Sequence, residues 1–256
     1  MFFKSKPKNG VNRDILVIPD CHVEPGQSNE RARWLGNLIA DRKPAGIVHI
    51  GDLAEMGSMS FHDPIKSTAY MMDVKAVKDF MELLKQHAGN AWVDANTYFC
   101  EGNHEARIRR RIAEQPELAG AIGLKDFGVY RDFDEVIEWG GGPGVLELNG
   151  VLFSHFIQGR TGRALGGVNH ARSLLLNCMQ SCVVGHSHAL SYAVHPLPRG
   201  DHAHAIVCGC FYDHHQEYAG QFSDKFWRGV VYLHDVHKGE LEPEFISMKR
   251  LKDRWR

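Results

Sequence analysis

Metal-binding residue types recur at the ends of short apolar runs in this sequence. Five runs of strand-like composition, at residues 14–19, 46–50, 97–100, 151–154 and 181–184, are each followed closely by Asp, Asn or His. The polar groups that follow them are Asp20-Cys21-His22, Gly51-Asp52, Gly102-Asn103-His104-Glu105, His155 and Gly185-His186-Ser187-His188. In open α/β sheets, ligands bind beyond the carboxyl ends of the strands, so we expect these side chains to converge.

The donor types indicate a class of metal. Asp, Asn and His supply mixed oxygen and nitrogen donors, which suit Mn, Fe, Zn or Ni better than a calcium loop or a thiolate cage would. In D-x-H and H-x-H an extended backbone places residues i and i+2 on one side, so both can face one cluster. Seven candidate ligands exceed the needs of one tetrahedral ion and suffice for two ions that share a carboxylate.

In this order, the five blocks resemble the signature of the calcineurin-like metallophosphoesterases. They run from residue 20 to residue 188 and so cover most of the chain. The resemblance implies an α/β metallophosphoesterase fold, a two-sheet β-sandwich of mixed sheets flanked by helices. It also implies two divalent metal ions as cofactors, with Mn as the expected metal and Fe, Zn or Ni as alternatives.

The resemblance further implies a role for each matching residue. One ion would be held by Asp20, His22, Asp52 and His188, and the other by Asp52, Asn103, His155 and His186. The expected catalytic residues are the bridging Asp52, His104 and Glu55. His104 would face the substrate, where it stabilises the transition state or protonates the leaving oxygen. Glu55 stands where similar phosphatases carry an acid that orients this histidine, which predicts a Glu55–His104 pair that raises the pKa of the imidazole.

Two departures from related families narrow the expected substrate. Protein Ser/Thr phosphatases with a similar pattern read G-D-x-x-D-R-G and grip the phosphate with the Arg, whereas this chain has Met56 at that position. Purple acid phosphatases place a Tyr among the iron ligands, whereas the matching residue here is His22. The missing Arg favours a phosphodiester, such as a small or cyclic nucleotide, over a phosphoprotein. His22 argues against a purple Fe(III) centre.

Arginines near these blocks are candidate contacts for the substrate. Arg107 lies on a helix expected after the third block, and Arg160 and Arg163 lie in the Gly-rich loop after His155. We expect these three to bind phosphate, and the alternative for each is a solvated position. The basic run from Arg107 to Arg111 also leaves open a nuclease that contacts DNA or RNA.

The elements that must position these residues follow from hydrophobic periodicity. Helices are expected at residues 29–43 and 69–87, between the first three strand-like runs. This β-α-β-α-β order predicts a largely parallel sheet with helices on its faces. In the second half, Asn149-Gly150 predicts a hairpin over residues 145–153. A helix is expected at 169–179, and strands at 181–184, 230–236 and 242–246.

Composition limits the alternatives. The 256 residues are 43% hydrophobic and 24% charged, enough for a sizeable core, and we expect one domain over residues 1–256. The net charge of -1 excludes binding to nucleic acid by bulk charge alone but is compatible with a local basic groove. There is no transmembrane-length apolar run and no secretory signal, so a cytoplasmic protein without a membrane partner is expected.

The favoured function is a dinuclear metal-dependent phosphoesterase that hydrolyses phosphodiester bonds, and also phosphomonoesters, through a metal-bridging hydroxide. Its partner would be a phosphate-ester substrate, with nucleotides and nucleic acids as candidates. One alternative is a metal-dependent nuclease, and another is a protein or small-molecule phosphatase. A phosphate- or nucleotide-binding module without turnover is the third, but such a module would not need His104 beside its ligands.

Overall fold

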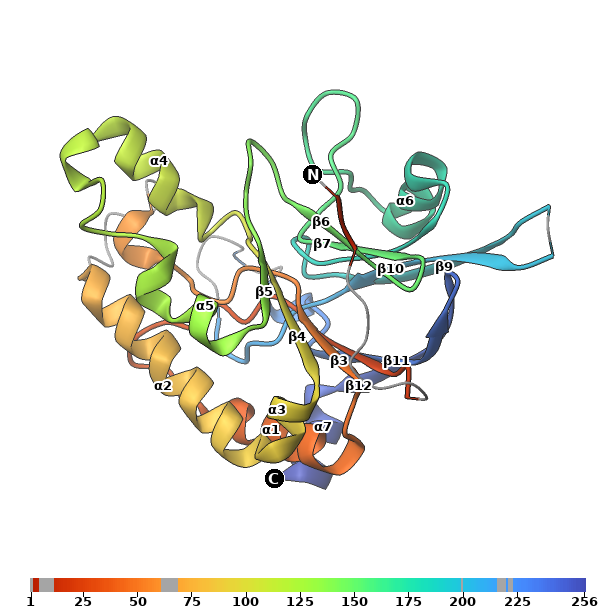
Figure 1. Ribbon diagram of the computed structural model, residues 1–256, viewed down its shortest axis with the longest axis horizontal. Coiled ribbons are helices and arrows are strands. Elements are labelled where there is room, and N and C mark those ends of the chain that lie inside the picture. Colours follow the sequence, from red (N-terminus) through yellow and green to blue (C-terminus); the bar gives the residue numbers. More distant parts are fainter. Residues whose placement is uncertain (1, 5–11, 61–68, 199, 216–219, 221–222) are drawn as a thin grey trace.

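Two six-stranded mixed sheets pack face to face, and helices cover both outer faces (Figure 1). The computed structural model describes residues 2–4, 12–60, 69–198, 200–215, 220 and 223–256. The predicted fold class, a β-sandwich of two mixed sheets flanked by helices, is confirmed. The expectation of one domain over residues 1–256 stays a prediction.

The first sheet, sheet I, has the strand order β12-β11-β2-β3-β4-β5. Its strands are β2 (Ile15–Ile18), β3 (Gly46–His49), β4 (Asn96–Cys100), β5 (Glu135–Ile137), β11 (Gly229–His237) and β12 (Glu240–Ser247). β2 to β5 pair in parallel, whereas β11 is antiparallel to both β2 and β12. The strands of the first half therefore form the parallel sheet that their alternation with helices predicts.

The second sheet, sheet II, has the strand order β1-β6-β7-β8-β10-β9. Its strands are β1 (Phe2–Lys4), β6 (Val145–Leu148), β7 (Val151–Ser154), β8 (Ser181–Val184), β9 (Leu190–Pro196) and β10 (His202–Cys208). β7 and β10 both pair in parallel with β8, and β6 and β7 form the predicted hairpin. Asn149 and Gly150 in its turn have φ angles of 50° and 87°, and a type I′ turn requires positive φ at both positions.

Helices cover the outer face of each sheet. Sheet I is covered by α1 (Glu30–Arg42), α2 (Tyr70–Ala88), α3 (Asn90–Asp94) and α7 (Met248–Trp255), and sheet II by α6 (His170–Cys178). The remaining described helices are α4 (Ala106–Glu114), α5 (Val129–Asp132) and 3₁₀ turns at Gly57–Met59, Pro116–Leu118 and Leu124–Phe127. In the described part of the chain, no helix has both the length and the apolar composition needed to cross a membrane.

Strand β2 shows why the predicted strands read as continuous apolar runs. Ile15 and Val17 point into the core between the two sheets. Leu16 and Ile18 point to the opposite side, into the core between sheet I and its helices. Because side chains alternate along a strand, a sheet that is covered on both faces needs apolar residues at every position.

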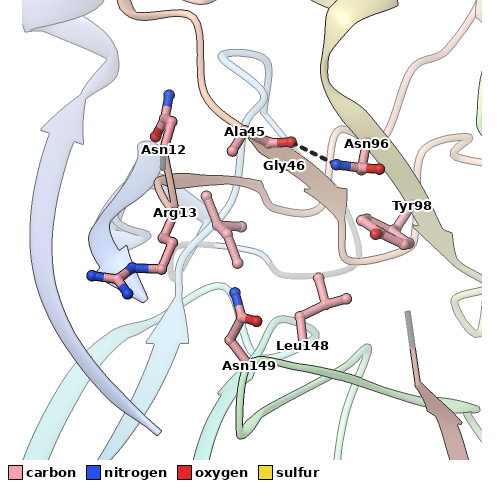
Figure 2. A pocket seen from close by; sticks show the side chains of 9 residues that line it. Asn12, Arg13, Ala45, Gly46, Asn96, Tyr98, Leu148 and Asn149 are labelled. Carbon is pink, nitrogen blue, oxygen red and sulfur yellow. Dashed lines mark hydrogen bonds between the residues drawn. The ribbon is translucent and has the colours of Figure 1, made fainter. Parts of the chain in front are cut away.

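The cavity at the amino-terminal ends of β2, β3 and β4 is too small to hold a substrate. Figure 2 shows a pocket at this edge, where the Asn96 side chain donates a hydrogen bond of 3.1 Å to the carbonyl of Ala45. The cavity measures about 20 Å³, roughly enough for one water molecule. The residues that could do chemistry lie at the opposite, carboxyl ends of these strands.

The closest approach of α1 to α2 yields a test of the helix layer. A Cβ atom added to Gly36 would lie 2.5 Å from the Leu84 carbonyl oxygen and 2.6 Å from the His87 Cβ. Alanine favours a helix by about 1 kcal/mol over glycine, but overpacking here costs about 1–3 kcal/mol or more because backbone must move. We expect Gly36→Ala to lower the free energy of unfolding by about 1–2 kcal/mol, measured by urea denaturation.

The matched control is Gly166→Ala, because an added Cβ there meets no atom within 4 Å. Its free energy of unfolding should stay within about 0.5 kcal/mol of the wild-type value. Equal stability of the two variants would show that α1 and α2 do not pack as closely as described.

Candidate metal centre

The loops after β2, β3, β4, β7 and β8 meet at one edge of the sandwich and bring the predicted ligands together. Three overlapping groups have donor atoms within 4.8 Å of one another: Asp20–His22–His188, His22–Asp52–His104 and Asp52–His155–His186. Asn103 joins the third group, with its Oδ1 2.9 Å from His155 Nε2. The expected convergence of the seven side chains is present, and their ligation of metal stays a prediction.

The first part of the cluster contains a buried nitrogen without a partner. His188 Nε2 lies 3.0 Å from Asp20 Oδ2, and the His22 and His188 rings are 4.9 Å apart. His22 Nε2 is buried and has no hydrogen-bond partner among the described residues. Leaving such an atom unsatisfied costs about 1–3 kcal/mol. Its place beside Asp20 and Asp52 fits an atom that coordinates a cation.

The second part of the cluster favours positive charge. His155 Nδ1 donates to the Ile50 carbonyl (3.0 Å), so its Nε2 faces Asn103 Oδ1 and, at 3.3 Å, Asp52 Oδ2. Burial opposes a charge on this imidazole, but the Asp52 carboxylate outweighs burial and raises the pKa of His155 to about 9. A position that holds a cation this strongly suits a divalent metal, with His155 then acting as a neutral ligand.

Both carboxylates of the cluster are ionised. Burial raises the pKa of Asp52, but His155 and His104 outweigh it and hold this pKa well below its usual range. Burial likewise opposes ionisation of Asp20, but the hydrogen bond from His188 and the charges of His155 and His188 together outweigh it, so the pKa is lowered. The buried cluster therefore combines two anionic carboxylates with imidazole and amide donors, a set that suits first-row divalent ions.

The cluster is built on unusual backbone. Four of the seven candidate ligands have φ angles in the left-handed region: His22 at 43°, Asp52 at 50°, His186 at 67° and His188 at 55°. Such conformations cost about 1–3 kcal/mol each for non-glycine residues and persist only where the surroundings enforce them. Here the Cys21 and His22 amides donate to the Asp52 carbonyl (2.9 and 3.0 Å), and the His186 amide donates to Asp20 Oδ2 (2.9 Å).

Two residues that position the cluster were missed in the sequence. The buried Glu105 carboxylate accepts hydrogen bonds of 3.0 Å from the amides of Asp52, Ala54 and Gly102, and so joins the loops after β3 and β4. Tyr212 Oη lies 3.0 Å from His188 Nδ1 and sets the direction of that ring. The place of Glu105 in the G-N-H-E block was an available signal, whereas Tyr212 had none.

The predicted Glu55–His104 pair is present at ion-pair distance, but the Glu55 carboxylate lies closer to His22. Glu55 Oε2 makes a short hydrogen bond with His22 Nδ1 and lies 3.8 Å from His104 Nδ1. His104 Nδ1 instead donates to the backbone carbonyl of Glu55 at 2.7 Å. The cause is backbone pairing: the Glu55 amide donates to the Val23 carbonyl (3.0 Å), which sets this segment beside the loop that carries His22.

The predicted rise in the pKa of His104 is wrong. Burial lowers this pKa to about 4, against the opposing effects of Asp52 and Glu55. The charge of Glu55 raises this pKa as predicted but does not outweigh burial, and the shortest hydrogen bond of its carboxylate is with His22. The Glu55 side chain is therefore a partner of a candidate metal ligand, an arrangement that fixes the tautomer and direction of metal-binding histidines.

The three predicted arginines lie in different surroundings. Arg107 donates from Nη1 to the Glu55 carbonyl (2.8 Å), and its Nη2 lies 3.0 Å from His104 Nε2, so it reaches the cluster. Arg163 is exposed and lines an open groove together with Asn103 and His186. Arg160 is exposed in the same loop. Phosphate binding by each of them stays a prediction.

A family model described as calcineurin-like phosphoesterase matches residues 13–209. The match extends from β2 through β10 and includes every residue of the cluster. A search of curated proteins finds no match.

The Glu55–His22 contact predicts an asymmetric effect on metal binding. Glu55→Gln keeps an acceptor for His22 Nδ1 but removes the charge, so we expect metal affinity to fall about tenfold at the site that includes His22. The site around His155 should change less. Calorimetric titration of the metal-free protein with Mn²⁺ or Zn²⁺ measures both affinities.

Two further variants calibrate that titration. Asp52→Asn should weaken both sites, because Asp52 belongs to donor groups on both sides of the cluster. Glu114→Gln should weaken neither, because Glu114 is exposed on α4. Equal weakening of the two sites by Glu55→Gln would contradict the assignment of its carboxylate to His22.

Proposed function

Because the chain belongs to the calcineurin-like phosphoesterase family, and is therefore a metal-dependent phosphoesterase, we propose that its preferred substrates are phosphodiesters. The observation that carries this proposal is the surroundings of Met56. This side chain is fully buried in the core between sheet I and its helices, so it contributes no cation to the site. A dianionic phosphomonoester would therefore lack one pair of charge-assisted hydrogen bonds from an arginine at this position. A monoanionic diester carries less charge and depends less on such a pair.

Arg107 supports the same preference. Its guanidinium already donates to the carbonyls of Glu55 (2.8 Å) and Met56 (3.3 Å) and contacts His104 Nε2 (3.0 Å). Three of its five N–H groups are thus committed to the protein. The remaining two can contact one phosphoryl oxygen, which matches the single negative charge of a diester.

Seven residues would hold two divalent ions in this proposal. Asp20, His22, Asp52 and His188 hold one, Asp52, Asn103, His155 and His186 hold the other, and Asp52 is shared. When bound, such ions supply Lewis-acid activation of a water nucleophile and of the phosphoryl group. Mn is the proposed metal because carboxylate, amide and imidazole donors are combined without thiolate, and Fe, Zn and Ni fit the same donor set.

His104 is the proposed catalytic contact with the leaving oxygen. Its Nδ1 is held by the Glu55 carbonyl, so a substrate would meet Nε2, the nitrogen that Arg107 Nη2 also contacts at 3.0 Å. Its ring lies 4.5 Å from that of His22, and its Nε2 lies 3.8 Å from Asp52 Oδ2. The imidazole therefore borders the cluster, and its amide donates to Asp52 Oδ1 (2.8 Å), which ties its position to the shared carboxylate.

A comparison of two aryl esters tests the substrate class. With Mn²⁺ bound, we expect kcat/KM for a bis-nitrophenyl phosphodiester to exceed that for the nitrophenyl monoester. Asp52→Asn should abolish both activities and so serves as the control against a contaminating phosphatase. A monoester preference of tenfold or more, about 1.4 kcal/mol of transition-state discrimination, would overturn the proposal.

Substrates with different leaving groups test whether His104 donates a proton. Because burial lowers the pKa of His104, only the minor protonated form of its imidazole can donate a proton near neutral pH. If that form acts as the acid, His104→Ala should retain its metals and lose about 10²–10⁴-fold in kcat with alkyl leaving groups, which need a proton. The loss should be much smaller with nitrophenolate, which leaves readily as an anion. His202→Ala, at a partly exposed histidine outside the cluster, should behave as wild type. Equal losses of His104→Ala on both leaving groups would rule out proton donation and leave electrostatic stabilisation as its role.

A further inference from the structure

An open groove leads away from the candidate metal centre, between α4 and the loop that follows β7. Its inner end is formed by Asn103 and His186, both members of the cluster. One wall is α4, and the other is the part of the loop that contains Arg163; both elements rise from the same edge of the sandwich (Figure 1). Its volume of about 630 Å³ lies within the range of roughly 300–1,000 Å³ that ligand sites occupy.

Aromatic side chains line this groove next to the cluster. The half-buried Trp139 packs edge-on against Phe156, with ring centroids 5.6 Å apart and an interplanar angle of 71°. Phe156 in turn lies 4.8 Å from the His186 ring. A partly exposed indole beside a phosphate-cleaving centre is a stacking surface that accepts any nucleobase, since every base has a π-face.

Arginines stand on both walls of the groove. Arg110 on α4 donates to the Asn103 carbonyl (3.2 Å), and Arg163 lies on the facing loop. Among the residues that the structure describes, neither forms an ion pair with a carboxylate. Arg109 differs, because Glu101 and Glu138 hold its guanidinium, both at 2.9 Å. Arg110 and Arg163 are thus the two groove cations that remain free for a phosphate.

The groove continues beyond Trp139. A second pocket of about 670 Å³ shares Trp139 and Gly141 with the first and runs along the Gly140–Gly144 loop. Together the two pockets extend from the cluster past Trp139 to the Gly140–Gly144 loop. An extended, open and partly cationic path with an aromatic surface favours a strand over a mononucleotide or a cyclic nucleotide.

We propose that this groove binds single-stranded nucleic acid, with one phosphodiester at the metal centre, the neighbouring base on Trp139 and the next phosphate between Arg110 and Arg163. This inference rests on the proposed phosphodiesterase function and adds the class of substrate. In the reaction, a water oxygen bonds to phosphorus and loses a proton, and the bond from phosphorus to one sugar oxygen breaks. That sugar oxygen takes up a proton, so the products are a phosphate-terminated and a hydroxyl-terminated strand.

The test compares an oligothymidylate with a bis-nitrophenyl phosphodiester on the full-length, Mn²⁺-loaded protein. Trp139→Leu should raise KM for the oligonucleotide about tenfold and leave kcat/KM for the aryl diester within about twofold. Arg110→Ala and Arg163→Ala should each make the salt dependence of log KM for the oligonucleotide shallower by about 0.7. Arg33→Ala removes an equal charge from α1, beside Glu30, and should change neither measurement.

A binding measurement separates stacking from turnover and from misfolding. Fluorescence anisotropy with a phosphorothioate oligothymidylate should show about tenfold weaker binding by Trp139→Leu than by the wild type. The melting temperature of each variant reports its folding. Arg110 and Arg163 are exposed, so their variants remain informative even if Trp139→Leu unfolds.

The outcomes distinguish the two proposals. If the wild type cleaves neither substrate, the phosphodiesterase function fails and the strand-binding groove fails with it. If it cleaves the aryl diester but not the oligonucleotide, or if the groove variants affect both substrates equally, only the groove proposal is overturned. A tenfold preference for duplex over single-stranded DNA would overturn it as well.

Discussion

The carboxylate of Asp52 is buried at the meeting point of the two sheets, and the arrangement of the site depends on keeping it charged there. An isolated buried carboxylate would be neutralised by its own desolvation cost. Here the imidazoles of His155 and His104 offset that cost and hold the pKa of Asp52 well below its usual range. The negative centre that results favours a cation at the position of His155, whose pKa is raised. The same negative charge would attract a divalent ion to the cluster.

The charged side chains around Asp52 come from both sheets of the sandwich. Asp20, Asp52 and Asn103 follow strands of sheet I, whereas His155, His186 and His188 follow strands of sheet II. The imidazoles of His155, His186 and His188 therefore meet the carboxylates only because the inner faces of the two sheets pack together. The loops are then locked by hydrogen bonds between their backbones and the cluster side chains, such as those that the Glu105 carboxylate accepts from three amides. Such locking stabilises the left-handed backbone at four of the candidate ligands.

Outside the cluster, Met56 contributes an apolar side chain, whereas α4 contributes arginines. Met56 turns into the core, so the position where related phosphatases carry an arginine contributes no charge. The guanidinium of Arg107 comes from α4, and it shares the Glu55 carbonyl with His104 as a common acceptor. The same helix presents Arg110 to the groove that contains Trp139. One helix thus links the cluster to the surface on which an extended substrate would lie.

The sequence by itself determined the features that depend on local chain chemistry. Apolar runs followed by Asp, Asn and His predicted both the strands and the edge at which the side chains gather, because parallel strands place their carboxyl ends together. Asn149-Gly150 predicted its hairpin because a type I′ turn needs two residues that tolerate positive φ. Tertiary structure decided what depends on the approach of distant segments. Glu55 contacts His22 because the backbone of one loop pairs with that of another, and Tyr212 reaches His188 from 24 residues away. Trp139, Arg110 and Arg163 share a groove for the same reason: they come from three separate segments, and no periodicity in the sequence encodes the distance between their side chains.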